Sequence, residues 1–423
     1  MHAPTLTFSD VAPEHFERLR DQWQSLVTRT QQPHLFRSFD WWFDVWRLCA
    51  QPKGHRLRLI AGSLNGELVL LWPLVEADRV LRMLSSGTLE YRGIIVDECK
   101  HSTAWVDQAW AYATRTARAD VYILQNVRVQ DALNRKLKRT RNAQPVGGGW
   151  RPVIRLERYE GWQEYSTGLP KSLIADQRRQ WRRICGALPN VAFQLVDRRE
   201  DIETTVRWIA RQKIAWAEAR EKSPTWCLDE RVLECHLRAV LAGHANGNLI
   251  MAKISNEYAT VSAGWGFVCG DEFLFHAFAY DAGYGTYSPS RLFLECLVRH
   301  CMRQNVRTFD FMPGDEPYKR TWSDDFVRTD SFMGPINRRG KLLMWLAKKK
   351  PATAGTAVKP LRTLYHSLPR LLRNSLEKKL REYRSIDGIL RLERPTAPPI
   401  SGPLSKNDVE PPPGLDRVVT QRE

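Results

Sequence analysis

Residues 272–312 have the sequence "EFLFHAFAYDAGYGTYSPSRLFLECLVRHCMRQNVRTFDFM". The run at 272–281 is rich in aromatic residues and predicts a strand. Ser288 and the proline after it predict the start of a helix that continues to residue 304. The apolar run at 306–312 predicts a second strand. Together they predict a strand–helix–strand unit with a glycine-containing loop in front of its helix.

The elements around this unit repeat an order that occurs earlier in the chain. A predicted hairpin, 248–268, precedes the unit. The earlier copy consists of the hairpin 57–75 around Asn65-Gly66, the strand 92–97, the helix 102–118 with Ser102 as a cap, and the strand 120–127. Further helices are predicted at 170–184, 201–220 and 228–242. We therefore expect an α/β fold (an α+β mixed sheet) made of a duplicated unit.

A break separates the two copies. "NAQPVGGGWRP" (142–152) contains prolines and three glycines and predicts a loop at a domain seam. We expect an N-terminal domain at 1–145 and a C-terminal domain at 146–336. A basic amphipathic helical segment is expected at 337–390, and a disordered, Pro-rich tail at 391–423.

The chain of 423 residues has a formal net charge of +17, which favours an anionic partner. Residues 337–390 contain 14 Lys and Arg against 3 Asp and Glu, a balance of +11. Because most of the excess lies in this segment, the charge does not predict that the main body binds nucleic acid.

The eight cysteines form no C-x-x-C pair, so neither a zinc framework nor a disulfide scaffold is expected. The N-terminus lacks the basic-then-apolar order of a signal peptide, and no run approaches 18 apolar residues. We expect a cytoplasmic protein with reduced thiols and without a metal.

The loop before the helix at 288–304 is a candidate anion site, because a helix N-terminus presents free N–H groups and the positive end of its dipole. Its candidate ligand-binding residues are Gly283, Gly285, Tyr287, Ser288 and Arg291. On these residues alone, an ordinary glycine-containing loop with a good cap is the favoured interpretation, because such loops before helices are common.

The second strand and the turn after it carry the candidate catalytic residues. Alternation places Asp310 with Thr308 and Met312, opposite two phenylalanines. A carboxylate in a buried strand needs a partner or a function. Asp315 and Glu316 follow at the carboxyl end of the strand, where ligands of open α/β sheets bind. A carboxylate can take a proton from an amine and a tyrosine can return one, but a solvated charged turn is the alternative.

These residues carry a resemblance to the GNAT acetyltransferase family that includes the CelD-like proteins of bacterial cellulose and exopolysaccharide loci. The helix start matches at Tyr287, Ser288, Pro289 and Leu292, and the following motif at Phe309, Asp310, Phe311, Gly314, Asp315, Glu316, Tyr318, Lys319 and Trp322. "LFRSFDWWFDVW" (35–46) and the stretch 64–74 extend the likeness, which covers roughly 30–335. The family is related to the FemABX aminoacyl transferases, which also have two GNAT-like halves.

The resemblance implies an acyl-CoA co-substrate, acetyl-CoA first, whose pantetheine lies between the two splayed strands and whose pyrophosphate lies at 282–288. It implies that an amine attacks the thioester directly, with Asp310, Asp315 or Glu316 as the base and Tyr318 as the acid. Alternation places His276 on one face with Leu274, Phe278 and Tyr280. A lone strand histidine is more often structural, and the resemblance makes His276 a lower-ranked base. The expected acceptor-side residues are Lys319, Trp322, Lys213 and Trp216. The acceptor is expected to be an amino sugar or a polysaccharide or lipid-linked precursor.

One departure from the family concerns the donor. Asp281 stands before Gly283 and Gly285, where the family has a basic residue. Binding of the pyrophosphate must therefore depend on backbone amides, Arg291 or a distant basic residue. Two alternatives stay open: a FemABX-like transferase that uses aminoacyl-tRNA, and a non-enzymatic scaffold of an envelope polysaccharide system.

The basic C-terminal segment is a candidate membrane contact. "KLLMWLAKKK" (341–350) places Leu, Met and Trp between lysines, a composition that suits an amphipathic helix on an anionic surface. One interpretation is peripheral contact of 338–383 with the inner membrane, and the other is a helix packed on the fold with a solvated basic edge. The packed helix is favoured for 338–350, and the two interpretations are nearly equal for 361–383.

Overall fold

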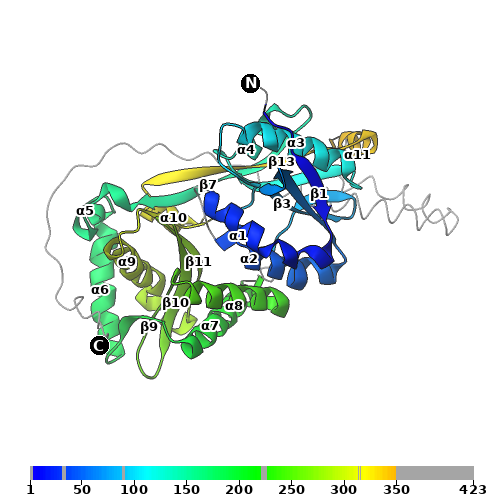
Figure 1. The fold of residues 1–423 in the computed structure, drawn as a ribbon. Helices are drawn as coiled ribbons and strands as arrows, with labels where there is room; N and C mark the ends of the chain where they lie inside the picture. Colours follow the sequence, from blue (N-terminus) through cyan, green and yellow to red (C-terminus); the bar gives the residue numbers. More distant parts are fainter. Residues whose placement is uncertain are drawn as a thin grey trace, which may run out of the picture.

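The computed structural model describes residues 3–30, 35–87, 91–220, 226–312, 314 and 316–348. Its centre is one mixed sheet of 13 strands with helices on both faces (Figure 1). The predicted α/β class with a mixed sheet is confirmed.

The first half contains β1 (Thr7–Val11), β2 (Arg56–Leu64), β3 (Glu67–Ala77), β4 (Val80–Met83), β5 (Ile95–Val96) and β6 (Val121–Arg128). Its helices are α1 (Arg20–Arg29), α2 (Phe39–Asp44), α3 (Ser102–Thr116) and α4 (Ala132–Arg139). Ser102 is the first residue of α3 rather than its cap, because its hydroxyl bonds to the carbonyls of Asp97 and Cys99 in the preceding turn.

The second half contains β8 (Ala192–Leu195), β9 (Leu249–Ser255), β10 (Thr260–Cys269), β11 (Glu272–Tyr280) and β12 (Thr308–Asp310). Its helices are α5 (Trp162–Thr167), α6 (Lys171–Ala187), α7 (Arg199–Glu218), α8 (Glu230–Ala245), α9 (Pro289–Arg303) and α10 (Pro317–Trp322). A 3₁₀ segment, Ala282–Tyr287, joins β11 to α9. The predicted order of hairpin, strand, helix and strand is present in both halves.

Two long strands join the halves: β7 (Gln144–Arg155) and β13 (Asp325–Pro335). The strand order is β1-β2-β3-β4-β6-β13-β7-β12-β11-β10-β9-β8, with β5 beside β3. In the first half, β6 is followed by the short helix α4 and then by β7, which lies beside the second half. In the second half, β12 is followed by the short helix α10 and then by β13, which lies beside the first half. β13 therefore pairs with β6, and β7 pairs with β12. The halves are interlocked by exchanged strands, which Figure 1 shows side by side at the centre.

The predicted loop at 142–152 is wrong, because residues 144–152 belong to β7. Gly147, Gly148 and Gly149 pair with residues 329–331 of β13. A Cβ at Gly148 would lie 2.9 Å from the carbonyl oxygen of Thr329, so the glycine permits a close approach of the two strands. The expected domain boundary at 145/146 falls inside this strand.

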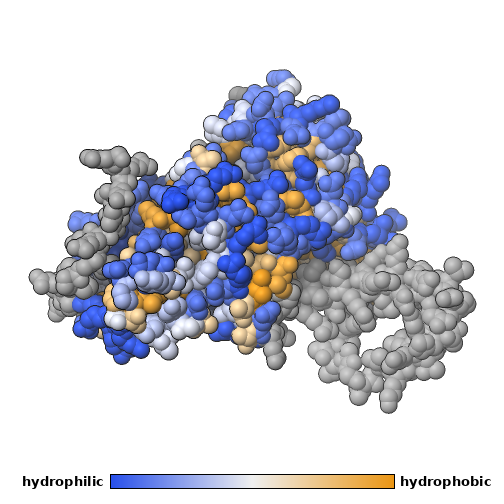
Figure 2. Space-filling view, turned by 90° about the horizontal axis from the view of Figure 1, so that it is seen from below, coloured by the Kyte–Doolittle hydropathy of each residue, from blue (hydrophilic) through white to orange (hydrophobic). Residues whose placement is uncertain are grey.

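Helices cover the sheet of the second half on both faces. A core with α5, α6 and α9 fills one face, and a core with α7 and α8 fills the other. A third core joins the halves, since α1, α2, β2 and β3 pack there with residues of α8, Leu274 and Met312. Seen from below, the outer surface is mostly hydrophilic with hydrophobic patches between (Figure 2).

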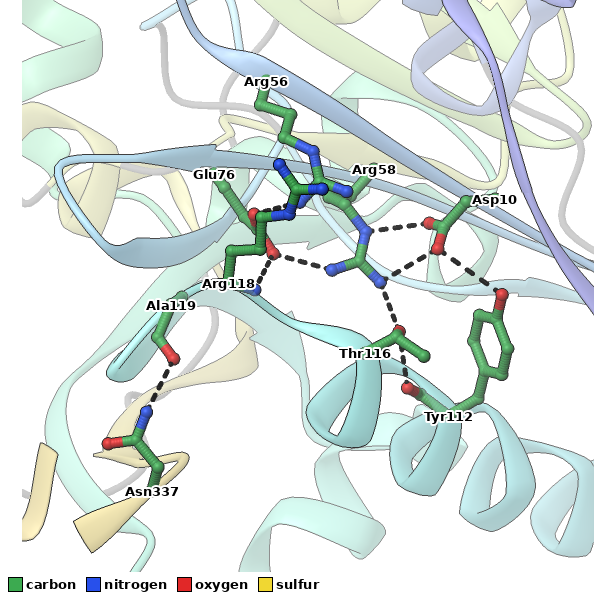
Figure 3. Close-up of polar contacts among 9 residues, drawn as sticks. All are labelled: Asp10, Arg56, Arg58, Glu76, Tyr112, Thr116, Arg118, Ala119 and Asn337. Carbon is green, nitrogen blue, oxygen red and sulfur yellow. Dashed lines mark hydrogen bonds and ion pairs between the residues drawn. The ribbon is translucent and has the colours of Figure 1, made fainter. Parts of the chain in front are cut away.

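A buried ion network ties the first half together (Figure 3). Arg58 on β2 is fully buried and donates to Asp10 on β1 at 2.8 Å and to Glu76 on β3 at 2.6 Å. It also donates to the hydroxyl of Thr116 at the end of α3. Burial of the guanidinium has a large desolvation cost, which the contacts with Asp10 and Glu76 offset.

The last described helix is α11 (Arg338–Lys348), which docks on the first half. Met344 packs against Val121 and Met333, and Asn337 donates to Ala119 and Asp120. The predicted segment beyond α11 and the predicted tail lie outside the described residues. Among the described helices, none has the length and apolar composition to span a membrane.

Candidate active site

The parallel pair β11 and β12 opens at Asp310. The two strands share only three residue pairs, which end at Leu274 opposite Asp310. β11 then continues to Tyr280 with β10 beside it on the other edge. Within the described sheet, the edge of residues 275–280 that faces β12 has no strand beside it. The sequence predicted this divergence only through the family resemblance.

A β-bulge lies at His276. Gly266 on β10 pairs with Phe275, while its neighbour Trp265 pairs with Ala277. His276 is the extra residue, and its ring faces Trp265 and Phe267 at 6.2 Å on the side of α7 and α8. The prediction that His276 shares a face with Phe278 and Tyr280 is wrong, because the bulge shifts the alternation.

His276 contacts a second histidine that the sequence analysis missed. Its Nε2 lies 3.1 Å from Nδ1 of His236 on α8. Burial, helped by the charge of Lys213, lowers the pKa of His276 to about 4, and burial lowers the pKa of His236 well below its ordinary value. Both rings are therefore neutral near pH 7. Nε2 of His236 is buried and has no hydrogen-bond partner among the described residues.

Lys213 on α7 belongs to the same group. Burial lowers its pKa most, and the positive charge of Lys319 lowers it further, whereas Cys227 and Glu316 raise it. The structure thus brings His276, Lys213, Glu316 and Lys319 from three separate elements into one electrostatic neighbourhood. We call these four residues, with His236, the bulge cluster. Trp216 lies three residues further along α7, 38% exposed, with Arg220 over its ring.

Two residues at the start of α10, Glu316 and Lys319, form the polar part of the bulge cluster. Nζ of Lys319 lies 2.9 Å from Oε2 of Glu316, and the lysine side chain is 7% exposed while the glutamate side chain is 53% exposed. Gly314 has φ 142° and lies directly under this pair, so a Cβ there would overlap both charged groups. Asp315 lies outside the described residues.

Tyr318 and Trp322 extend from α10 towards the other face of the sheet. Tyr318 packs edge-on against Phe311 at 6.3 Å, and burial together with nearby Glu316 raises the pKa of its hydroxyl. Trp322 is buried in the core beside Trp162, and its carbonyl accepts a hydrogen bond from Tyr165. Trp322 therefore packs α10 against this core.

Asp310 is 2% exposed and has two partners. It accepts a hydrogen bond from the hydroxyl of Tyr91, and its Oδ1 accepts one from the backbone N–H of Met312 at 2.7 Å. The ring of Tyr91 lies between two arginines, with Arg128 at 3.9 Å and Arg151 at 4.0 Å. The alternation predicted for Asp310 is confirmed, because Met312 packs in the core between the halves and Phe309 in the core with α9.

The candidate anion loop has a different local structure from the one predicted. The carboxylate of Asp281 accepts a bond from N–H of Gly283 at 2.8 Å, so the acidic residue caps the 3₁₀ segment. Ser288 precedes α9, but its φ of 54° is left-handed and its side chain makes no capping bond. Arg291 forms an ion pair with Asp176 on α6.

Arg183 on α6 supplies the basic residue that the loop itself lacks. It donates to the carbonyl of Thr286 at 3.1 Å, and its guanidinium lies 5.1 Å from the ring centre of Tyr287. Gly283, Gly285, Tyr287, Ser288 and Arg291 lie in the same loop and first helical turn. No sequence pattern near the loop reveals Arg183, since it comes from a helix about 100 residues earlier.

A separate cleft of about 320 Å³ lies between α2 and α8. Trp41, Asp44, Arg238 and Asn248 are among the residues that line it. Trp41 also contacts His236, at 5.5 Å between ring centres, so this tryptophan borders both the cleft and the bulge cluster. It is not lined by any residue of the β11–β12 opening.

The second half of the chain matches a known protein family. Residues 171–320 match the family model described as an acetyltransferase (GNAT) domain. The crystal structure of FemX is similar over 80% of this chain and 99% of its own, with 12% identity and a TM-score of 0.53.

Two other solved structures have lower scores. A tandem GNAT protein from the clavulanic acid biosynthesis pathway has 11% identity over 78% of this chain and 99% of its own, with a TM-score of 0.45. The C-terminal domain of a putative lysylphosphatidylglycerol synthetase from Agrobacterium fabrum has 10% identity over 78% and 95%, with a TM-score of 0.48. A search of curated proteins gave no match. The chain thus contains a region that matches the GNAT acetyltransferase domain, within a fold similar to that of FemX.

Proposed function

We propose that the protein is an acyl-CoA-dependent N-acyltransferase. The observation that carries the proposal is the opening between β11 and β12, with the loop before α9 at one end and the bulge cluster beside it. The match of 171–320 to a GNAT domain supports this assignment.

The residues on the donor side suit an acyl-CoA. In the first turn of α9, Pro289 has no N–H and the N–H groups of Arg291 and Leu292 bond to the Ser288 carbonyl, so the N–H of Ser290 and the helix dipole remain for a diphosphate. Arg183 adds a guanidinium next to Tyr287. The open edge of β11 offers backbone groups to the amides of an extended pantetheine arm. When bound, the acyl-CoA supplies an activated carbonyl as a thioester.

The residues on the acceptor side suit an amine. Glu316 is accessible and can hold an acceptor ammonium and take its proton. Asp315, its neighbour in the sequence, is a second candidate carboxylate. Lys319 can bind an anionic group of the acceptor. The new N–C bond forms as the C–S bond breaks, and Tyr318, whose raised pKa keeps it protonated, can give its proton to the departing sulfur. His276 is neutral and bonded to His236, so it can orient a group through a hydrogen bond.

The acceptor class we propose is an amino sugar, or an amine on a polysaccharide or lipid-linked precursor. This class is suggested only by the resemblance to proteins of cellulose and exopolysaccharide loci, since the motif residues themselves do not specify an acceptor. The test is release of free coenzyme A from acetyl-CoA with glucosamine and with other amines as acceptors. Amine-dependent release supports the proposal, and its absence with every amine and acyl chain length contradicts it.

A FemABX-like use of aminoacyl-tRNA is the second candidate, and the fold similarity to FemX is the observation that favours it. A thermal-shift comparison separates the two. Stabilisation by acetyl-CoA alone supports the first candidate, and stabilisation by charged tRNA alone supports the second. A protein that neither ligand stabilises fits the scaffold alternative.

We also propose that α11 contacts an anionic membrane surface at the cytoplasmic side. Leu342, Trp345 and Leu346 are 55%, 51% and 44% exposed and share one face of the helix, while Met344 faces the fold. Lysines and arginines flank this face in the sequence, and basic residues predominate in the segment that follows. Apolar residues between cations are the composition that binds anionic lipid surfaces.

A further inference from the structure

A series of hydrogen bonds connects Tyr91, through Asp310, to the residues that precede α10. Tyr91 belongs to the first half and donates to Asp310 at the end of β12. Asp310 in turn accepts from the N–H of Met312, which has φ 60°. A left-handed conformation is costly for a side chain such as methionine, so it persists because neighbouring contacts hold it.

The turn that Asp310 holds leads directly to the polar end of the bulge cluster. Met312 and Gly314 both have positive φ, and the pair Glu316–Lys319 packs over Gly314. The position of both charged groups therefore depends on the backbone conformation of Met312 and Gly314. Asp310 accepts a hydrogen bond from the N–H of Met312, the first of these two residues.

Tyr91 is itself fixed from both sides. Arg128 on β6 and Arg151 on β7 lie over its two faces, and Arg128 also pairs with Glu272 at the start of β11. Nη1 and Nη2 of Arg151 are buried and have no geometric hydrogen-bond partner among the described residues. Burial lowers the pKa of Arg151, and Tyr91 and then Asp310 oppose this by favouring the charged form. Removal of the Asp310 charge would leave this arginine buried and uncompensated.

We infer that Asp310 is a positioning residue, which, together with Tyr91, couples the first half of the protein to the turn that presents Glu316 and Lys319. Its carboxylate does not reach the reacting groups, because both oxygens are engaged in the buried contact with Tyr91 and Met312. The catalytic consequence rests on the proposed function, whereas the structural coupling does not.

The test combines hydrogen–deuterium exchange with steady-state kinetics on the full chain. Asp310→Ala removes both contacts, Asp310→Asn retains an oxygen that can accept from Met312, and Tyr91→Phe removes only the link to the first half. Tyr112→Phe is the matched control, since this tyrosine on α3 also donates to a carboxylate, Asp10, but lies away from α10.

We expect the amides of 316–322 to exchange about tenfold faster in Asp310→Ala, less so in Tyr91→Phe, and at the wild-type rate in Tyr112→Phe. Asp310→Asn should stay close to wild type at these amides even though the loss of charge lowers its stability. Amides of α9 should not change in any variant. Equal exchange of 316–322 in Tyr91→Phe and Tyr112→Phe would overturn the coupling, including in the case that Asp310→Ala does not fold.

With acetyl-CoA and glucosamine, kcat should fall at least tenfold in Tyr91→Phe while KM for acetyl-CoA stays within twofold, because the donor loop is not moved. A rise in KM without a loss of kcat would overturn the positioning role. If the wild-type protein transfers no acetyl group, the proposed function is contradicted. The hydrogen–deuterium exchange of 316–322 would still test whether Tyr91 and Asp310 couple the first half to this turn.

Discussion

The hydroxyl of Tyr91 donates a hydrogen bond to the carboxylate of Asp310, although 219 residues separate them in the chain. The contact joins the two halves at the centre of the sheet, close to the exchanged strands β7 and β13. Since Asp310 ends the strand that borders the opening, the first half takes part in shaping a site whose other described residues come from the second.

Arg183→Ala should weaken the binding of acetyl-CoA. A charge-assisted hydrogen bond contributes about 1.5–3 kcal/mol, so we expect KM or Kd for acetyl-CoA to rise about tenfold or more with a smaller change in kcat. Calorimetric titration measures this directly. Arg182→Ala on the same helix is the control, because its exposed side chain should not contribute. Identical affinities of the two variants would show that α6 does not bind the donor.

Lys319→Met and Glu316→Gln should each lower kcat. Loss of a positioned proton acceptor costs about 10²- to 10⁴-fold, and we expect this range for Glu316→Gln or for the corresponding change at Asp315. Arg320→Met, on the exposed side of the same helix, should keep near wild-type turnover. Thermal unfolding of all variants checks that they fold. Wild-type turnover in both the Glu316 and Lys319 variants argues against this site.

Arg58→Met should strongly destabilise the first half, because Asp10 and Glu76 lose their buried partner. Breaking a buried ion pair costs about 3–5 kcal/mol, whereas an exposed one contributes less than about 1 kcal/mol. The matched control is Arg56→Met, since Arg56 also pairs with Glu76 but its side chain is 41% exposed. Urea unfolding should give a much lower midpoint for Arg58→Met. Equal midpoints would mean that the network does not stabilise the fold.

Stability should fall at acidic pH partly because of His276. Its folded-state pKa of about 4 lies below its ordinary value of 6.5, so the unfolded chain binds the proton more tightly. The contribution of the neutral ring is complete above about pH 6.5 and is lost as the pH falls towards 4. The free energy of unfolding, measured in urea between pH 7 and pH 4, should depend less on pH in His276→Gln. His300, with a similar pKa, remains in both proteins, so only part of the slope should disappear.

Leu342→Ser with Trp345→Ser should reduce binding to vesicles that contain anionic phosphatidylglycerol. The two exposed side chains provide apolar area and the neighbouring cations provide charge, so binding of the wild type should also weaken in high salt. Tyr258→Ser, which removes an 83% exposed aromatic residue elsewhere, is the control for sedimentation. Equal sedimentation of all three proteins would refute a membrane role for α11.

Much of the fold follows from the sequence because local patterns determine it. The hairpin at Asn65-Gly66, the proline at the start of α9 and the alternation around Asp310 are all present as expected. The exchange of β7 and β13 was not predictable, because glycines and prolines at 142–152 indicate a loop unless a partner strand is known. Only the register with β13 shows that the glycines serve a close strand contact.

The site was predicted in part for the same reason. Glu316, Tyr318 and Lys319 lie in one motif, and a motif is visible in sequence. Arg183, His236 and Tyr91 act through contacts between distant elements, which no local pattern encodes. The bulge at His276 likewise depends on the pairing of β10 with β11, so simple alternation assigned the side chain to the wrong face.

A crystal structure of the protein with acetyl-CoA tests the central claim most directly. The account predicts a diphosphate at the loop 282–288 beside Arg183, and an acyl group between β11 and β12 close to His276 and Tyr318. Acetyl-CoA bound instead in the cleft between α2 and α8, or an empty β11–β12 opening at saturating acetyl-CoA, would contradict it.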